Sequence, residues 1–309
     1  MSKNKTKNSE LSLLLNCLRP SLKLLSKNDP MRMAGATAFF TTFALPPIVF
    51  ILTQLFGLFI GHRNVGQGLI ENLTNTLGKD GAEQVRQVVR SIYGFSDNWY
   101  VIFFGFLFLV FVATTLFSEI KNSMNDLWQI NVKDKPGFLF VLSGRARSVG
   151  IILLAGILFF ADLFLESIEV IAGNYLDEIW KGSSAYFKSA VQHIVSVIIV
   201  ASWFILLFRF LGDGRPGWKA AVIGGLLTGI LFIAGKLALR FLLINSGIGS
   251  LYGAAGSFVL LLLFVFYSSF ILYYGASFIA VYSEKKQRPI VPGGNSYKYT
   301  IQKMEEHPG

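Results

Sequence analysis

The chain has 309 residues, of which 53% are hydrophobic and only 15% are charged. Soluble proteins carry about 25% charged residues, so this composition excludes an ordinary soluble domain and favours folding within a lipid bilayer. The formal net charge is +10. In a soluble protein such an excess suggests nucleic-acid binding. Here its distribution along the chain indicates membrane topology instead, and no nucleic-acid partner is expected.

Residues 1–32 form the first predicted unit, a cytoplasmic amphipathic segment. Its leucines recur at helical spacing and its basic residues lie away from them. The pattern predicts a helix that is interrupted at Pro20, because proline cannot donate a helical hydrogen bond. Either this helix lies in the cytoplasmic membrane interface, or it packs beneath the helix bundle. The residues concerned are Leu11, Leu14, Leu15, Leu18, Leu22 and Leu25, with Arg19, Lys23 and Lys27.

Residues 33–283 contain six apolar segments that reach the length of about 20 residues needed to cross the hydrocarbon core. A transmembrane β-strand would alternate apolar and polar residues, whereas residues 101–112 are apolar on every side. The predicted fold class is all-α, a polytopic membrane bundle of six transmembrane helices with additional interfacial amphipathic helices. The predicted spans are Met33–Ile60, Trp99–Phe117, Val149–Ile168, Ala190–Phe208, Trp218–Leu243 and Ala254–Tyr282.

The lysines and arginines orient this bundle. If both termini are cytoplasmic, most of the 28 basic residues fall in segments on the inner side, in agreement with the positive-inside rule. We therefore predict a multi-pass protein whose inner face contacts the anionic headgroups of membrane lipids. The tail, residues 284–309, is polar and contains prolines and glycines, so it is expected to be disordered.

Amphipathic stretches also occur outside the predicted spans. The outer loop, residues 62–98, contains two of them, which predict short helices. Residues 66–93 of this loop are a candidate docking surface for an envelope protein. A third stretch begins the second inner loop, where Ile120, Met124 and Trp128 share one helical face.

Charged residues at membrane depth are costly and mark candidate functional positions. Asp162 and Glu166 lie four residues apart in the third predicted span. Lys236 and Arg240 have the same spacing in the fifth span. Both spans run from inside to outside, so these charges fall in the outer half of the bilayer. They form either a polar pathway or headgroup site, or a structural ion pair with snorkelling side chains; whether Asp162 pairs with Lys236 or with Arg240 is open.

Three other features bear on helix shape and packing. Pro46 and Pro47 predict a kink in the first span, because neither can complete the helical hydrogen-bond ladder. Gln54 in the same span is a candidate for hydrogen bonding across helices or for lining a cavity. In the fifth span, Gly225 and Gly229 lie on one face and predict close helix packing.

No catalytic site, metal site or cofactor is predicted. The chain has one cysteine, Cys17, and three histidines far apart in the sequence, so it offers no recognisable ligand set. Residues 212–217 match the glycine pattern of a dinucleotide site, but they lie between two predicted membrane helices, so a turn is the better interpretation. Nothing combines a nucleophile with a base. No oligomeric state is predicted.

Several stretches share their order and character with one known family. Residues 36–47 lead from small and aromatic residues into two prolines, and an asparagine-then-tryptophan stretch follows the second span. A tyrosine and a glycine open the last helix. The positions are Asn122, Asn125, Trp128, Tyr252 and Gly253. These features resemble the YihY/BrkB family of bacterial inner-membrane proteins. Residues 275–277 read Gly-Ala-Ser, where the family often has Gly-Ala-Glu.

The resemblance implies a place in the bacterial cytoplasmic (inner) membrane and a part in envelope integrity. We expect the protein to bind or transport an amphipathic lipid or lipid-linked envelope component. The alternative is a structural or scaffolding protein without transport activity. Some family members were once labelled as a ribonuclease, but a metal-dependent nuclease needs a cluster of carboxylates or histidines. The inner loops supply only the scattered Glu119, Asp126, Asp134 and Asp213.

Overall fold

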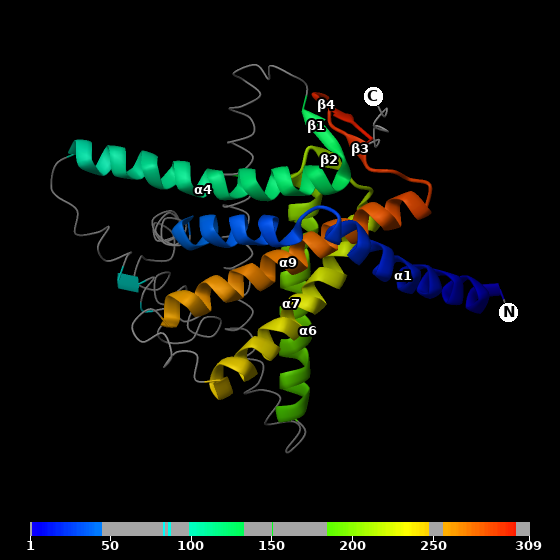
Figure 1. The fold of residues 1–309 in the computed structure, drawn as a ribbon. Coiled ribbons are helices and arrows are strands. Elements are labelled where there is room, and N and C mark those ends of the chain that lie inside the picture. Colours follow the sequence, from blue (N-terminus) through cyan, green and yellow to red (C-terminus); the bar gives the residue numbers. More distant parts are fainter. Residues whose placement is uncertain are drawn as a thin grey trace, which may run out of the picture.

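The computed structural model describes residues 2–44, 83, 86–87, 99–132, 150, 184–246 and 256–300. In this part of the chain, residues 30–44 form a helix. The long helices are α1 (Ser2–Ser26), α4 (Trp99–Trp128), α6 (Ser184–Phe210), α7 (Trp218–Ser246) and α9 (Gly256–Lys285). They meet near a group of short strands and diverge from there (Figure 1).

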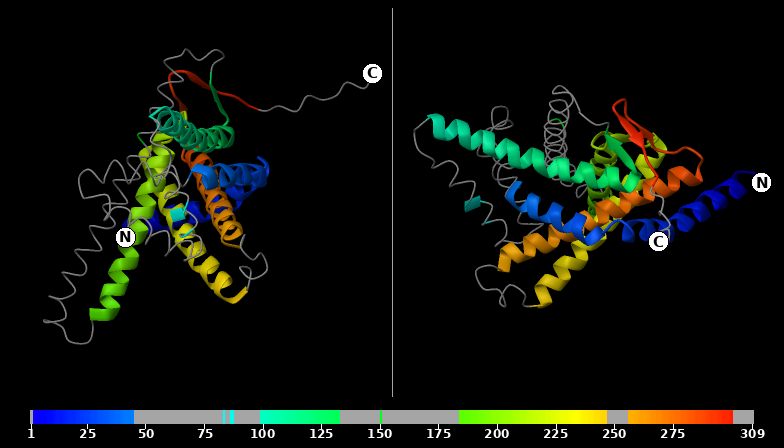
Figure 2. Two further views of the ribbon diagram at one scale, coloured as in Figure 1. Left: turned by 90° about the vertical axis from the view of Figure 1, so that its left-hand side faces the viewer. Right: turned by 45° about the horizontal axis from the view of Figure 1, so that its top comes forward.

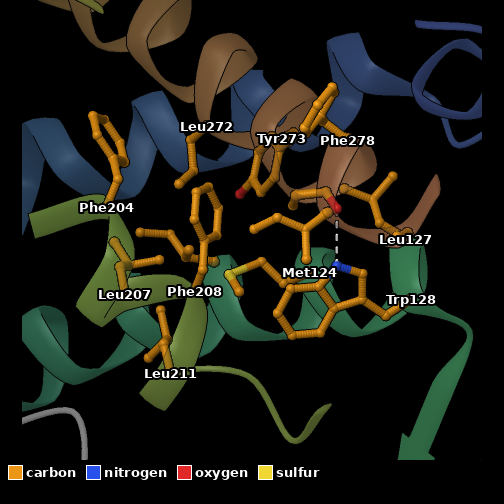
Figure 3. Close-up of a cluster of buried hydrophobic side chains, with 14 of the residues drawn as sticks. Met124, Leu127, Trp128, Phe204, Leu207, Phe208, Leu211, Leu272, Tyr273 and Phe278 are labelled. Carbon is orange, nitrogen blue, oxygen red and sulfur yellow. Dashed lines mark hydrogen bonds between the residues drawn. The ribbon is translucent and has the colours of Figure 1, made fainter. Parts of the chain in front are cut away.

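Helix α9 is the central element of the described bundle. It packs against α1, α4 and α7, while α6 packs against α7. The core lies where these helices converge, and its largest side chains interdigitate there (Figure 3). Met124 and Trp128 come from α4, Phe208 from α6, and Tyr273 and Phe278 from α9. The largest cluster of buried side chains in the described residues therefore lies near the end of the bundle that carries the strands.

Two helices in the described residues are long and apolar enough to cross a membrane. They cover Trp218–Ala238, with mean hydropathy 1.9, and Leu261–Lys285, with mean hydropathy 1.7. These segments coincide with the fifth and sixth predicted spans. Residues Val197–Phe210 of the fourth predicted span form a shorter apolar helix. The total of six spans stays a prediction, and Pro46 and Pro47 lie outside the described residues.

The predicted close packing of α7 is confirmed. A side chain at Gly229 would place its Cβ 3.1 Å from the backbone Cα and nitrogen of Ala201 in α6. At Gly225, a Cβ would come within 2.9 Å of the backbone nitrogen of Ile205. On another face of α7, Gly224 meets Ile279 of α9. Small residues therefore let α7 approach two neighbouring helices at once.

The described residues are mostly helical, as predicted, and two short antiparallel sheets add to the helices. Strand β1 (Ile130–Val132) pairs with β4 (Ser296–Lys298), and β2 (Gly214–Arg215) pairs with β3 (Val291–Pro292). Both sheets lie at the same end of the bundle, as the two views of Figure 2 show. Strands β1 and β2 belong to different interhelical connections, so the chain after α9 joins both of them. The end of α4, the end of α6 and the start of α7 are thereby linked.

The same sheets overturn the expectation of a disordered tail for residues 286–300. Beyond the strand pairing, Gly293 N donates to the Asp213 carbonyl at 2.8 Å, and Tyr299 N donates to the Gln129 carbonyl at 2.9 Å. Ile290 is buried. Composition suggested disorder because the tail is polar, but its backbone groups find partners on loops that are distant in sequence. Residues 301–309 lie outside the described part.

The predicted interruption of the N-terminal helix at Pro20 is wrong, because α1 continues through it. Proline lacks the N–H that would bond to the carbonyl four residues earlier, which belongs to Asn16. Lys285 Nζ of α9 donates to that carbonyl instead, at 2.7 Å. Tyr274 Oη adds a hydrogen bond to the Leu18 carbonyl at 3.1 Å. The hydrogen bond that Pro20 removes from α1 is thus replaced by a contact that docks α1 on α9.

Helix α4 also differs from its prediction in extent. The second predicted span and the amphipathic stretch that follows it form one continuous helix that ends at Trp128. No glycine or proline lies between Phe117 and Trp128 to interrupt it. The helix ends where Gln129 takes a left-handed conformation, with φ 55°, a common way for helices to stop.

Substituting Gly229 by leucine tests the packing of α7 against α6. The new side chain meets the Ala201 backbone, which cannot move aside as a flexible side chain can, so we expect a loss of about 1–3 kcal/mol in the free energy of unfolding. The matched control is Gly35→Ala, because a Cβ at Gly35 meets nothing within 4 Å. Unfolding curves in detergent measure both changes. An unchanged curve for Gly229→Leu contradicts the packing.

The reactivity of Cys17 reports whether α1 is docked. Cys17 is the chain's single cysteine and is fully buried, and burial raises the pKa of its thiol. A raised pKa leaves less reactive thiolate at neutral pH. We expect slow maleimide labelling in the folded protein and fast labelling after unfolding in dodecyl sulfate, measured by mass shift. Equal rates in both states would show that α1 does not cover Cys17.

Candidate functional site

The structure describes only part of the predicted polar site. Lys236 lies in α7 with its side chain half-buried. Arg240 lies one turn later in the same helix, and the structure places its backbone alone. Asp162, Glu166 and Gln54 lie outside the described residues, so their pairing with the α7 charges stays a prediction.

Lys236 occupies a distinctive position on α7. It follows Gly229 by two helical turns, so it continues the side of α7 that packs on α6. The neighbouring side of α7 exposes Val222, Leu226 and Ile230 at four-residue spacing. Lys236 therefore lies at the border between a helix–helix contact and an exposed apolar face. A group in the surrounding lipid can approach an ammonium at such a border.

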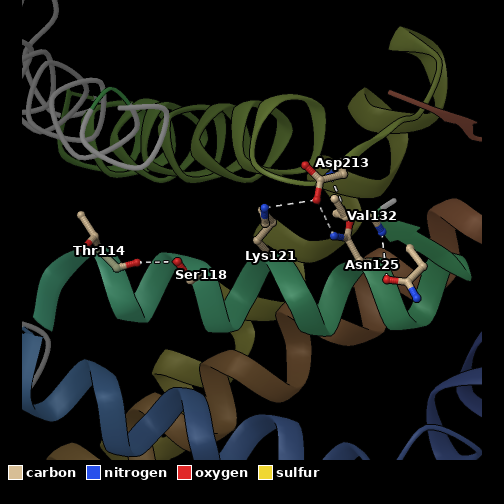
Figure 4. Close-up of polar contacts among 7 residues, drawn as sticks. Thr114, Ser118, Lys121, Asn125, Val132 and Asp213 are labelled. Carbon is tan, nitrogen blue, oxygen red and sulfur yellow. Dashed lines mark hydrogen bonds and ion pairs between the residues drawn. The ribbon is translucent and has the colours of Figure 1, made fainter. Parts of the chain in front are cut away.

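A second polar site lies at the strand end of the bundle, where Lys121 and Asn125 of α4 meet Asp213 (Figure 4). Asn125 Nδ2 donates to Asp213 Oδ2 at 2.8 Å, and Asp213 N donates to Asn125 Oδ1 at 3.0 Å. Lys121 Nζ lies 3.2 Å from Asp213 Oδ2. We call these three residues the Asp213 cluster. The carboxylate of Asp213 is nearly inaccessible, and its Oδ2 contacts both Lys121 and Asn125, so the cluster holds elements together rather than offering a reactive group.

The turn that carries Asp213 closes over the ring of Trp128. A Cβ at Gly212 would lie 2.5 Å from a ring carbon of Trp128, and one at Gly214 would lie 2.7 Å from the same side chain. The indole Nε1 donates to the Ala276 carbonyl of α9 at 3.0 Å, a bond drawn in Figure 3. These glycines serve close contact with an aromatic ring. Residues 212–217 form a short connection between helices, as predicted, in which Gly214 and Arg215 also form strand β2; helix α6 and not a strand precedes them, so they do not fit the dinucleotide motif.

A pair of hydroxyl groups connects the helix of residues 30–44, in the first predicted span, with α9. Thr37 Oγ1 and Tyr273 Oη lie 2.5 Å apart, and both side chains are buried. Buried hydroxyl groups need such partners, because an unpaired polar group in the bundle is costly. Ser277, at the position where the resemblance would place a glutamate, is also buried, and its Oγ has no hydrogen-bond partner among the described residues.

A small cavity of about 160 Å³ opens beside this end of the bundle. Apolar side chains of α1, α4 and α9 line it, together with Gln129. Glu284 and Lys298 also line it and form an ion pair at 3.6 Å. Ligand-binding pockets usually measure about 300–1,000 Å³, so this one is too small for a lipid headgroup with its chains. Among the described residues, no group of three or more histidine, cysteine, aspartate or glutamate side chains could hold a metal ion.

Comparison with known proteins places this chain in a family. A family model described as "Virulence factor BrkB" matches residues 21–299. The chain belongs to the BrkB family. No solved structure matches it significantly.

Relatives of this BrkB-family chain are named as UPF0761 membrane proteins. One from Saccharophagus degradans is 25% identical over 82% of the chain and 56% of its own length. Another, from Pseudoalteromonas translucida, is 22% identical over 81% of the chain and 80% of the relative. A third, from Alkalilimnicola ehrlichii, is 23% identical over 89% and 61% respectively. The chain thus spans little more than half of some relatives, and it is a membrane protein like them.

The BrkB-like positions named from the sequence have distinct places in the structure. Asn125 and Trp128 face the core and hold the connection between α6 and α7. Asn122 is exposed, while Tyr252 and Gly253 lie outside the described residues. Sequence reasoning treated Asp213 as an isolated carboxylate. The spacing of Lys121 and Asn125 on one helical face was the available signal, but only the fold shows that Asp213 meets them.

Replacing Asp213 by alanine tests the cluster in this BrkB-family protein. The change leaves the Lys121 ammonium and the Asn125 amide without their partner, so we expect a loss of about 3–5 kcal/mol in unfolding free energy. The double variant Lys121→Met/Asp213→Leu removes both charges and should lose less unfolding free energy than Asp213→Ala. Asp126→Ala is the control, because Asp126 is an exposed aspartate on α4, the helix that carries Lys121 and Asn125. Denaturant titration in detergent measures all three; equal losses for Asp213→Ala and Asp126→Ala would contradict the assignment.

Proposed function

We propose that this BrkB-family protein binds an anionic amphipathic component of the bacterial envelope, a lipid or lipid-linked precursor, and moves it across the inner membrane. Lys236 and Arg240 meet the negatively charged headgroup, and Asp162 and Glu166 belong to the same polar pathway. Both termini lie in the cytoplasm. The proposal is for a transporter without enzymatic activity.

The position of Lys236 carries the proposal. Helix α7 begins at Trp218, and Lys236 follows 18 residues later. This separation corresponds to about 27 Å along the helix at 1.5 Å per residue. This places an ammonium within an apolar span that covers Trp218–Ala238. Lys236 lies two residues before the end of this span, and charges inside membrane segments are retained mainly where they serve a ligand or a pathway. An ammonium attracts the negative charge of a lipid headgroup.

The surroundings of Lys236 support access from the lipid phase. The adjacent face of α7 exposes large apolar side chains, among them Ile230 and Leu237, and acyl chains can lie against such a face. The side that contains Gly225 and Gly229 packs on α6. A lipid can therefore place its chains on the exposed face of α7 while its headgroup reaches Lys236 at the border.

Flux measurements with Lys236→Gln test this function. Purified protein in liposomes should move fluorescent phosphatidylglycerol between leaflets, followed by dithionite quenching. We expect Lys236→Gln to slow this movement roughly tenfold, the equivalent of about 1.4 kcal/mol in headgroup interaction. The matched control is Lys219→Gln, because Lys219 is exposed at the first turn of the same helix and should leave the rate unchanged.

Two outcomes would contradict the proposal. Movement no faster than in protein-free liposomes argues against transport, and equal effects of the two lysine substitutions argue against a role for Lys236. In either case the scaffolding alternative gains support. The scaffolding alternative predicts that deleting residues 66–93 abolishes the protein's part in envelope integrity. The remaining bundle should still fold, as judged by its thermal unfolding.

A further inference from the structure

Helix α1 has two different faces, and only one of them is used by the bundle. Cys17, Ser21 and Leu25 follow one another at four-residue spacing and are buried against the rest of the protein. The docking contacts run along α9, with Leu18 beside Tyr274 and Asn16 beside Lys285. The sequence left open whether α1 packs on the bundle or lies in the membrane interface. One face of α1 packs on the bundle.

The opposite face of α1 carries exposed apolar and basic side chains. Leu15 is 59% exposed and Leu22 is 48% exposed. These leucines lie seven residues apart, so they share a face. Arg19 lies between them on that face, and Lys23 flanks it. All the charged side chains from residue 11 to residue 28 are basic. Exposed leucines bordered by basic residues are typical of helices that lie in a membrane interface.

The connection after α1 fixes this face near the membrane boundary. Only residues 27–29 separate α1 from the helix of residues 30–44, which begins the first predicted span. In the first turn of that helix, Met31 is 66% exposed and adds a third apolar side chain. On the other side, α1 docks on the second half of the candidate span Leu261–Lys285, at Tyr274 and at Lys285. The end of α1 therefore adjoins the start of the first predicted span, and Lys285, which Asn16 contacts, is the last residue of the candidate span in α9.

We infer that the exposed face of α1 lies on the anionic phospholipid surface of the membrane in which the protein is embedded. Leu15, Leu22 and Met31 enter the boundary between headgroups and acyl chains. Arg19, Lys23 and Lys27 extend their stems over this boundary and bring their charges to the lipid phosphates.

Charge decides between lipid and protein as the occupant of this face. A second copy of the chain would present the same basic face, and two such faces repel each other. The acidic residue within α1, Glu10, already pairs with Lys286 of the bundle, with the Lys286 Nζ to Glu10 Oε1 distance at 2.5 Å. An anionic bilayer offers both negative charge and an apolar layer directly beneath it, which matches basic residues that border leucines. The inference stands independently of any transport activity.

A fluorescent label at residue 22 tests this placement in the full-length protein. In a Cys17→Ala background, Leu22→Cys is labelled with an environment-sensitive nitrobenzoxadiazole dye. The protein is then reconstituted in phosphatidylcholine vesicles with or without phosphatidylglycerol. We expect blue-shifted emission and quenching by nitroxide-labelled lipid, both stronger when phosphatidylglycerol is present. Asn295→Cys is the control, because Asn295 is exposed in the turn before β4 and its label should stay in water.

Charge reversal provides the second measurement. The triple variant Arg19→Glu/Lys23→Glu/Lys27→Glu should lose the lipid quenching at residue 22, while its thermal unfolding in detergent stays close to that of the parent, because these side chains are exposed. A label at residue 22 as aqueous as that at residue 295 would overturn the inference. Quenching that is unchanged by phosphatidylglycerol or by the charge reversal would also overturn it. Should Leu22→Cys fail to fold, Leu15→Cys reports on the same face.

Discussion

A single carboxylate, that of Asp213, connects the parts of the chain on which this fold depends. Its side chain accepts from Asn125 and lies against the Lys121 ammonium, both on α4. Its backbone carbonyl accepts from Gly293, in the segment after α9. A buried charge is tolerated only when its partners stay in place. This site therefore fixes α4, the connection between α6 and α7, and the segment after α9 relative to one another. The long helices diverge from this end of the bundle.

The packing of Trp128 strengthens the same end. Its ring fills the space that Gly212 and Gly214 leave open, and its nitrogen donates to the Ala276 carbonyl. The strands after α9 add backbone bonds to the loops that follow α4 and α6. Segments that the charge pattern assigns to the inner side of the membrane therefore meet at one end of the bundle (Figure 1), as segments on one side of a membrane should. Which side this is stays a prediction from the positive-inside rule.

Away from this end, the described bundle combines close packing with sites for polar groups. Helix α7 uses its glycines to approach α6 and α9, and it carries Lys236 beyond them at the border of an exposed apolar face. Helix α1 combines the two roles that its sequence pattern suggested as alternatives. Its carbonyl at Asn16, freed by Pro20, anchors it to Lys285, and its basic face stays available for the lipid surface.

The sequence by itself determined the membrane character, the existence of the long apolar helices, the close-packing face of α7 and the family, because these depend on composition, length and helical periodicity, which are local. Asn125 and Trp128 were recognisable as motif positions, but not as partners of Asp213 and Ala276. The predictions of a disordered C-terminal segment and of a helix interrupted at Pro20 were wrong. Both depend on hydrogen bonds to groups far away in sequence, and only tertiary structure decides which distant backbone group finds a partner.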